Sequence, residues 1–122
     1  MTVIRLYTKI INTSDFAGKL IEGLMSKGYK LNVIYDETTT NKFVLKKTIF
    51  SESLYFSDLN KSISPQFFNY DILLNLSLKF IPHFSSFNNF IEIFNSNDSK
   101  VLNQRITYFN FRGYPLKIFQ NI

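Results

Sequence analysis

The chain contains no cysteine, and its candidate chemical groups are one histidine and carboxylates that lie beside hydroxyls. This composition excludes thiolate nucleophiles, paired redox cysteines and thiolate metal sites. The one histidine, His83, follows Pro82 at the end of an apolar run, where loops carry both catalytic and ordinary residues. No serine–acid pair and no metal-ligand spacing accompanies His83, so we expect an ordinary loop histidine.

The carboxylates Asp36 and Glu37 precede three consecutive threonines, a composition that could hold magnesium or orient a phosphate. Neighbouring residues at a strand end point to opposite faces, however, and no glycine-rich loop lies nearby. A turn whose side chains bond their own backbone accounts for the same residues. We therefore expect a protein that is not an enzyme and that uses no cofactor and no metal.

A row of basic and aromatic residues is the sharper feature. Arg5, Tyr7 and Lys9 alternate along the first predicted strand and share its outward face. Sheets that bind single-stranded RNA stack bases on aromatic rings and hold phosphates with cations. Residues 42–50 nevertheless lack the glycine and the exposed aromatics of the RNA-recognition motif, and such a row is also ordinary on a half-buried strand.

Basic residues exceed acidic ones by 14 to 9, which gives a net charge of +5. One group lies at residues 42–47, and another lies in residues 100–122, a stretch without any acid. This excess permits nucleic-acid or acidic-protein partners without requiring either. The candidate partner-binding residues are Arg5, Tyr7, Lys9, Lys42, Lys46, Arg105, Arg112 and Lys117.

Phenylalanine and tyrosine, with 14 and 7 copies, are unusually abundant, and there is no tryptophan. Most of these rings are expected in the core. A chain of 122 residues cannot readily bury all of them, and exposed aromatic area bordered by Asn and Ser is suited to a protein interface.

The first half of the chain must position these residues on a strand, a helix and further strands. Alternation predicts a strand over residues 3–11, and helical spacing predicts a helix with Ser14 as its N-cap and Gly28 as its stop. Strands are then expected from Leu31 to Tyr35 and over residues 42–50, joined by a polar turn at 36–41. A short strand is expected over residues 53–57.

The second half is predicted to begin with a short helical turn at residues 64–65 and a strand over residues 71–81. The spacing of Phe87, Phe90, Ile91 and Phe94 predicts a helix over residues 86–95, although phenylalanine and isoleucine there also tolerate a strand. Residues 104–111 and 114–120 are expected to form a closing hairpin around Gly113. The order predicts one α+β domain over residues 1–122, with an antiparallel or mixed sheet of about five to six strands and two helices.

No signal peptide and no apolar segment of about 20 residues is visible, so we expect a soluble cytoplasmic protein without membrane contact. Its expected function is that of a non-catalytic protein-binding module, an inhibitor or immunity-type partner of a toxin or another mobile-element accessory protein. A basic inhibitor would suit a toxin with an acidic surface. The alternative is a single-stranded RNA or other nucleic-acid-binding domain that uses the basic and aromatic sheet face.

Overall fold

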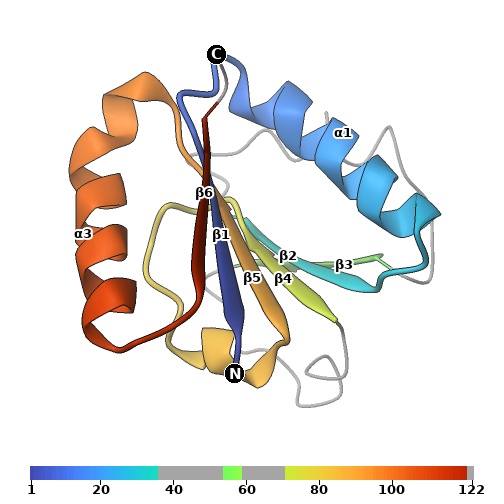
Figure 1. The fold of residues 1–122 in the computed structure, drawn as a ribbon. Coiled ribbons are helices and arrows are strands. Elements are labelled where there is room, and N and C mark those ends of the chain that lie inside the picture. Colours follow the sequence, from blue (N-terminus) through green and yellow to red (C-terminus); the bar gives the residue numbers. More distant parts are fainter. Residues whose placement is uncertain (36–53, 59–70, 121–122) are drawn as a thin grey trace.

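The structure, a computed structural model, describes residues 1–35, 54–58 and 71–120. These residues form one six-stranded sheet with an α-helix on each face (Figure 1). In chain order the elements are β1 (Val3–Thr8), α1 (Thr13–Ser26), β2 (Leu31–Tyr35), β3 (Leu54–Asp58), β4 (Ile72–Asn75), the 3-10 helix η2 (Pro82–Ser86), β5 (Asn89–Ile93), the 3-10 turn η3 (Ser96–Asp98), α3 (Ser99–Phe111) and β6 (Leu116–Gln120).

The sheet is parallel throughout, so the predicted antiparallel or mixed sheet is wrong. Its strand order is β3-β2-β4-β5-β1-β6, and all five neighbouring pairs run in the same direction. Parallel strands require crossover connections, and helices provide two of these crossovers. The fold is therefore a layered α/β arrangement rather than a set of hairpins.

The two helices lie on opposite faces because their crossovers run in opposite directions along the sheet. The connection through α1 leads from β1 past β5 and β4 to β2, whereas the connection through α3 leads from β5 past β1 to β6. Crossovers between parallel strands are almost always right-handed. Two such crossovers in opposite directions must cover opposite faces, as Figure 1 shows for α1 and α3.

Each face of the sheet has its own apolar core. On the α1 face, Ala17, Ile21 and Leu24 pack against residues of β2, β4 and β5. On the α3 face, Phe109 packs with four other buried rings and with aliphatic side chains of the sheet; Phe90 and Phe94 are among these rings. The α1 core receives only the half-buried Tyr7 from β1 and no residue of β6, so the α1 side of these two strands is less covered.

The first elements follow the sequence closely. The predicted strand over 3–11 is β1, which ends at Thr8 because Lys9 adopts a left-handed φ of 58°. The predicted first helix is confirmed, but its N-cap is Asn12 rather than Ser14. The Asp15 amide donates to the Asn12 side-chain oxygen over 3.0 Å. Gly28, with a φ of 90°, follows the helix as expected.

The middle strands show both agreement and error. Strand β2 and the short strand β3 are confirmed. Strand β4 has only the four residues Ile72–Asn75, and Asn75 and Ser77 are buried instead of facing solvent. The predicted strand over 42–50 and the helical turn at 64–65 lie outside the described residues.

The predicted helix over 86–95 is wrong, because this segment contains β5. Phe90 faces α3 and Ile91 faces α1, so the strand is buried on both faces. A central parallel strand of this kind has a continuous apolar run without two-residue alternation. The spacing of its phenylalanines therefore matched the periodicity of an amphipathic helix.

The predicted closing hairpin is also wrong, because residues 104–111 belong to α3 and only its second arm is a strand. Asn95 and Asp98 form a capping box just before this helix. Gly113, with a φ of 74°, ends it, and the Tyr114 amide donates to the Phe109 carbonyl. The helix then leads into β6, which joins the far side of β1. Neither described α-helix has the length and apolar character needed to cross a membrane.

Candidate functional site

Two neighbouring strands bring four of the basic and aromatic side chains together. Arg5 is in register with Lys117, and Tyr7 is in register with Phe119, on the parallel pair β1 and β6. Register partners in a parallel pair point to the same side of the sheet. These four residues therefore form one surface on the α1 side, here called the β6 face.

Aromatic contacts fix the end of the β6 face that Tyr7 and Phe119 form. The Tyr7 and Phe119 rings stack with centroids 4.8 Å apart, and Phe16 of α1 contacts Tyr7 with a centroid distance of 5.2 Å. The Thr8 hydroxyl donates to the Phe119 carbonyl over 3.2 Å, which ties β6 to β1. Tyr7 is thus held between two rings, while Phe119 keeps 41% of its surface exposed.

The other end of the β6 face, at Arg5 and Lys117, carries two positive charges that have no negative partner among the described residues. The ion pairs within the described part of the chain are Asp15–Lys19 and Glu92–Arg105, and neither involves Arg5 or Lys117. Arg5 Nε is buried and lacks a hydrogen-bond partner. Two uncompensated cations beside exposed aromatic surface favour a ligand that carries a carboxylate or a phosphate.

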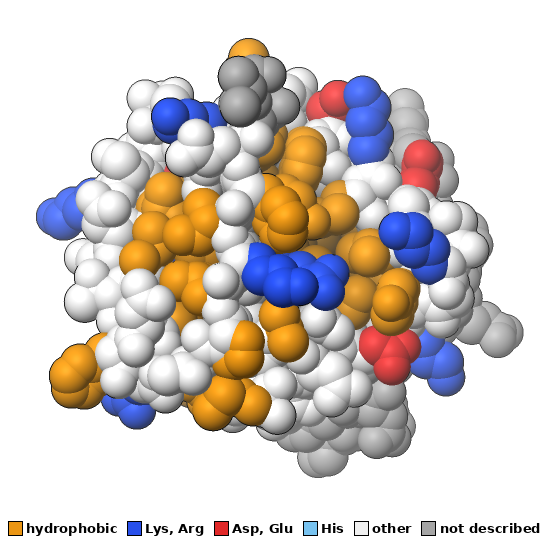
Figure 2. All heavy atoms as spheres, viewed as in Figure 1, with side chains coloured by type: hydrophobic (Ala, Val, Ile, Leu, Met, Phe, Trp, Pro, Cys, Tyr) orange, Lys and Arg blue, Asp and Glu red, His pale blue; other side chains and the backbone are white. Residues whose placement is uncertain are grey.

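The surface around β6 is apolar as well as basic. In the orientation of Figure 1, β6 lies in front, and Figure 2 shows hydrophobic side chains on both sides of a central group of Lys and Arg atoms. Ile118, on the opposite side of β6 from Phe119, has 45% of its surface exposed. An edge strand of this composition offers both packing area and charge.

The remaining predicted residues are scattered. Lys9 is exposed but lies beyond the end of β1. Arg112 follows α3 on the other side of the sheet, with its guanidinium carbon 4.5 Å from the centre of the Tyr108 ring. Lys42 and Lys46 lie outside the described residues. The structure therefore unites only Arg5, Tyr7 and Lys117 of the predicted set.

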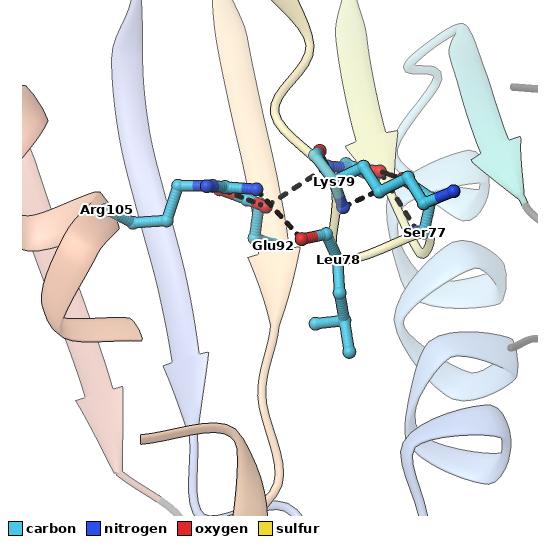
Figure 3. Close-up of polar contacts among 6 residues, drawn as sticks. Ser77, Leu78, Lys79, Glu92 and Arg105 are labelled. Carbon is cyan, nitrogen blue, oxygen red and sulfur yellow. Dashed lines mark hydrogen bonds and ion pairs between the residues drawn. The ribbon is translucent and has the colours of Figure 1, made fainter. Parts of the chain in front are cut away.

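Arg105 was predicted as a partner-binding candidate, but the structure places its side chain inside the protein. Its side chain lies between α3 and the sheet with 8% of its surface exposed. Arg105 Nε donates to both carboxylate oxygens of Glu92, over 2.9 and 3.2 Å (Figure 3). Its Nη2 atom donates to the Leu78 carbonyl over 3.0 Å. The guanidinium is therefore engaged inside the protein.

A hydrogen-bond network extends this buried pair to the loop after β4. Asn75 Nδ2 donates to Glu92 over 3.1 Å and to the Lys79 carbonyl over 2.7 Å. The Asn75 oxygen accepts from the amide and the hydroxyl of Ser77. Leu78 adopts a left-handed φ of 63° within this loop. The network thus holds a strained loop against β5 and α3, which is a structural role.

The Glu92 carboxyl titrates near neutral pH because of its burial. Desolvation raises its pKa to about 7, while the charge and the hydrogen bond of Arg105, and a hydrogen bond from Asn75, act in the opposite direction. A perturbed carboxyl in a cleft would suggest catalysis. Glu92, however, has no exposed surface, so substrate has no access to it in this conformation.

His83 lies in η2, where its ring centroid is 6.3 Å from that of Phe87. Partial burial lowers the pKa of His83 below its ordinary value, because burial disfavours the charged imidazolium. No group of three or more potential metal ligands occurs within the described ranges. The expected absence of catalysis and of metal remains a prediction.

A small cavity of about 100 Å³ opens beyond the carboxyl ends of β4 and β5. Ligands of open parallel sheets commonly bind at this edge. Its lining combines Thr13 and Ser14 of α1 with Asn95, Asp98 and three aliphatic residues. The volume suffices for a few water molecules and is far below that of an ordinary small-molecule pocket.

Sequence reasoning missed three residues that matter here. Phe119 was counted among many phenylalanines, and its position beside Tyr7 required the parallel pairing of β1 with β6. Glu92 and Asn75 stood within apolar stretches, Ile91–Ile93 and Leu73–Leu76 in the printed sequence. A lone polar residue inside an apolar run is the signal that could have identified them as buried and paired.

No model of a known protein family matches this sequence, and no curated protein matches it.

Proposed function

We propose that this chain is a non-catalytic protein-binding module that contacts its partner through the β6 face. The observation that carries the proposal is the joint position of Lys117 and Phe119 on an edge strand, beside Arg5. Aromatic residues and arginine are enriched in protein interfaces. The residues that contribute most binding energy lie at the centre of an interface, from which water is excluded. The β6 face offers this combination where α1 covers the sheet only in part, through the contact of Phe16 with Tyr7.

The partner surface is expected to be acidic. Arg5 and Lys117 lack carboxylate partners in the described structure, and the chain has a net charge of +5. Complementary charge accelerates association and selects among partners more than it adds affinity. The narrower proposal of an inhibitor or immunity protein adds that the bound partner, such as a toxin, loses its activity.

Single-stranded RNA binding is the competing proposal, and the aromatic geometry favours it less. Stacking of bases requires free ring faces. Tyr7 is packed between Phe16 and Phe119, and Lys9 lies beyond the strand. Only Phe119 of the β6 face combines an aromatic ring with large exposure.

Co-purification from cells of the source organism tests the proposal with matched baits. The wild-type chain should retain one stoichiometric partner after nuclease treatment, and Phe119→Ser should lose it. Lys100→Glu is the control, because Lys100 is an exposed cation on α3, away from the β6 face. Loss of binding after nuclease treatment, or equal retention by Phe119→Ser, would contradict the proposal. Addition of the wild-type chain to the purified partner then tests the inhibitor role.

A further inference from the structure

The outer edge of β6 has backbone groups that no described strand covers. The Ile4 amide donates to the Pro115 carbonyl over 2.8 Å, and the Phe119 carbonyl accepts from Thr8. Residues 115, 117 and 119 therefore direct their backbone groups toward β1. Because successive residues alternate in a parallel ladder, Leu116, Ile118 and Gln120 direct theirs away from it. We call these outward groups the β6 edge.

An open edge is a template for another strand, and proteins commonly protect it with charge. Lys117 protects the β6 edge against pairing with a second copy of the chain. In an antiparallel pairing centred on Ile118, two copies would bring both Lys117 side chains and both Arg5 side chains onto the same sheet face. Four cations without carboxylates would then lie close together, which disfavours self-association.

The same charges favour a strand of opposite sign. Neighbouring strands lie about 4.8 Å apart, so a residue of an added strand would stand directly beside Lys117. The Arg5 side chain starts one strand farther away, and its length allows it to reach the same position. A carboxylate there would interact with the charges of both Lys117 and the Arg5 guanidinium.

We propose that the β6 edge binds an extended strand of a partner protein, and that this strand carries a carboxylate beside Lys117 and Arg5. The proposal rests on the proposed function and specifies how the partner binds. The added strand extends the sheet beyond β6, with its carboxylates on the side of Lys117 and its apolar side chains on the opposite side, beside Ile118. Main-chain hydrogen bonds supply affinity, and the carboxylate supplies selectivity.

Two peptides of equal length serve as probes, Thr-Ile-Glu-Val-Glu-Ile-Thr and its counterpart with lysine at both glutamate positions. Each peptide is titrated into the 15N-labelled chain and followed by nuclear magnetic resonance. The acidic peptide should shift and protect the amides of Leu116, Ile118 and Gln120 more than those of Lys117 and Phe119. It should bind at least about tenfold more tightly than the basic peptide, as two unpaired cations predict.

Variants separate strand addition from a general charge effect. Ile118→Pro removes an outward amide at a position where an edge strand tolerates proline, so the fold should persist while binding falls at least about tenfold. Ile118→Val is the matched control, because it keeps the outward amide and an apolar β-branched side chain, and it should lose far less binding than Ile118→Pro. Lys117→Glu should reverse the preference between the two peptides.

Several results would overturn strand addition. Strand addition is contradicted if the acidic peptide does not bind at about 1 mM, a concentration that would detect binding of about 4 kcal/mol, or if both peptides bind equally. It is also contradicted if the amide shifts lack the alternating pattern, or if Ile118→Pro binds as well as the wild type. A wild-type chain that is dimeric by sedimentation would show that a second copy occupies the edge. If the co-purified partner is lost from Phe119→Ser but retained by Ile118→Pro, protein binding stands and strand addition fails.

Discussion

Replacement of Arg105 by methionine tests whether the buried ion pair holds α3 to the sheet. The change keeps an unbranched apolar side chain but removes both hydrogen bonds to Glu92 and the bond to the Leu78 carbonyl. Glu92 would keep only the bond from Asn75 while it remains buried. Loss of one partner of a buried pair costs about 3–5 kcal/mol, and we expect this loss of unfolding free energy at pH 8.

The cost should depend on pH with a definite sign. Without Arg105, which lowers the pKa of Glu92, that pKa rises further above its ordinary value. Stability contributed by the neutral carboxyl is then fully present at low pH and is lost as pH rises through the raised folded pKa. The difference between variant and wild type should therefore be smaller at pH 5 than at pH 8.

Urea denaturation followed by far-ultraviolet circular dichroism measures these differences, since the chain contains no tryptophan. Arg112→Met is the control, because Arg112 is exposed and its guanidinium lies over the Tyr108 ring. The loss of unfolding free energy from this variant should be below about 1 kcal/mol. The double variant Glu92→Met with Arg105→Met should be more stable at pH 8 than Arg105→Met alone. A cost below about 1 kcal/mol for Arg105→Met at pH 8 would refute the structural role and return Arg105 to the candidate surface residues.

Three further predictions concern the same titration and two local backbone features. The unfolding free energy of the wild type should fall by about 3 kcal/mol between pH 4.5 and pH 7 through Glu92, since the folded pKa of Glu92 is raised to about 7. Glu92→Gln should remove this part of the pH dependence, measured by urea titrations at each pH. An unchanged pH dependence in Glu92→Gln would contradict the assignment of the titration to Glu92. Asn12→Ala should cost about 1 kcal/mol through loss of the N-cap, whereas Ser14→Ala should cost less than half as much; equal costs in thermal unfolding would argue against the Asn12 cap. Lys9→Gly should stabilise the chain by about 1 kcal/mol because Lys9 is exposed at a φ of 58°, and Lys9→Ala should give no such gain; a lower melting temperature for Lys9→Gly would show that the strain is absent.

Local signals in the sequence predicted the elements that depend on them. The alternation from Ile4 to Thr8 and the glycine at position 28 located β1 and the end of α1. The segments buried on both faces carried no such signal. In β5, Phe90 and Ile91 both face a core, and nothing in their spacing distinguishes a central parallel strand from a helix.

The errors in the candidate site have a common cause, which is the pairing of distant segments. Arg105 was a partner-binding candidate because it belongs to the basic, acid-free stretch of residues 100–122. Its partner Glu92 lies 13 positions away on a segment predicted to be helical. For the β6 face, the sequence placed Arg5 and Tyr7 on one strand face, while Lys117 and Phe119 were assigned to a hairpin. Only the parallel register of β1 with β6 unites them.

The position of β1 also has a consequence for how the chain folds. Both neighbours of β1 are remote in sequence: Val3 pairs with Asn89, and Ile4 pairs with Leu116. During synthesis β1 therefore has no strand partner until β5 has left the ribosome, although α1 follows it at once. Closure of such long loops is slow relative to local helix formation. We expect the docking of β1 between β5 and β6 to limit the rate of folding, and α1 to form before the strand that precedes it finds its place.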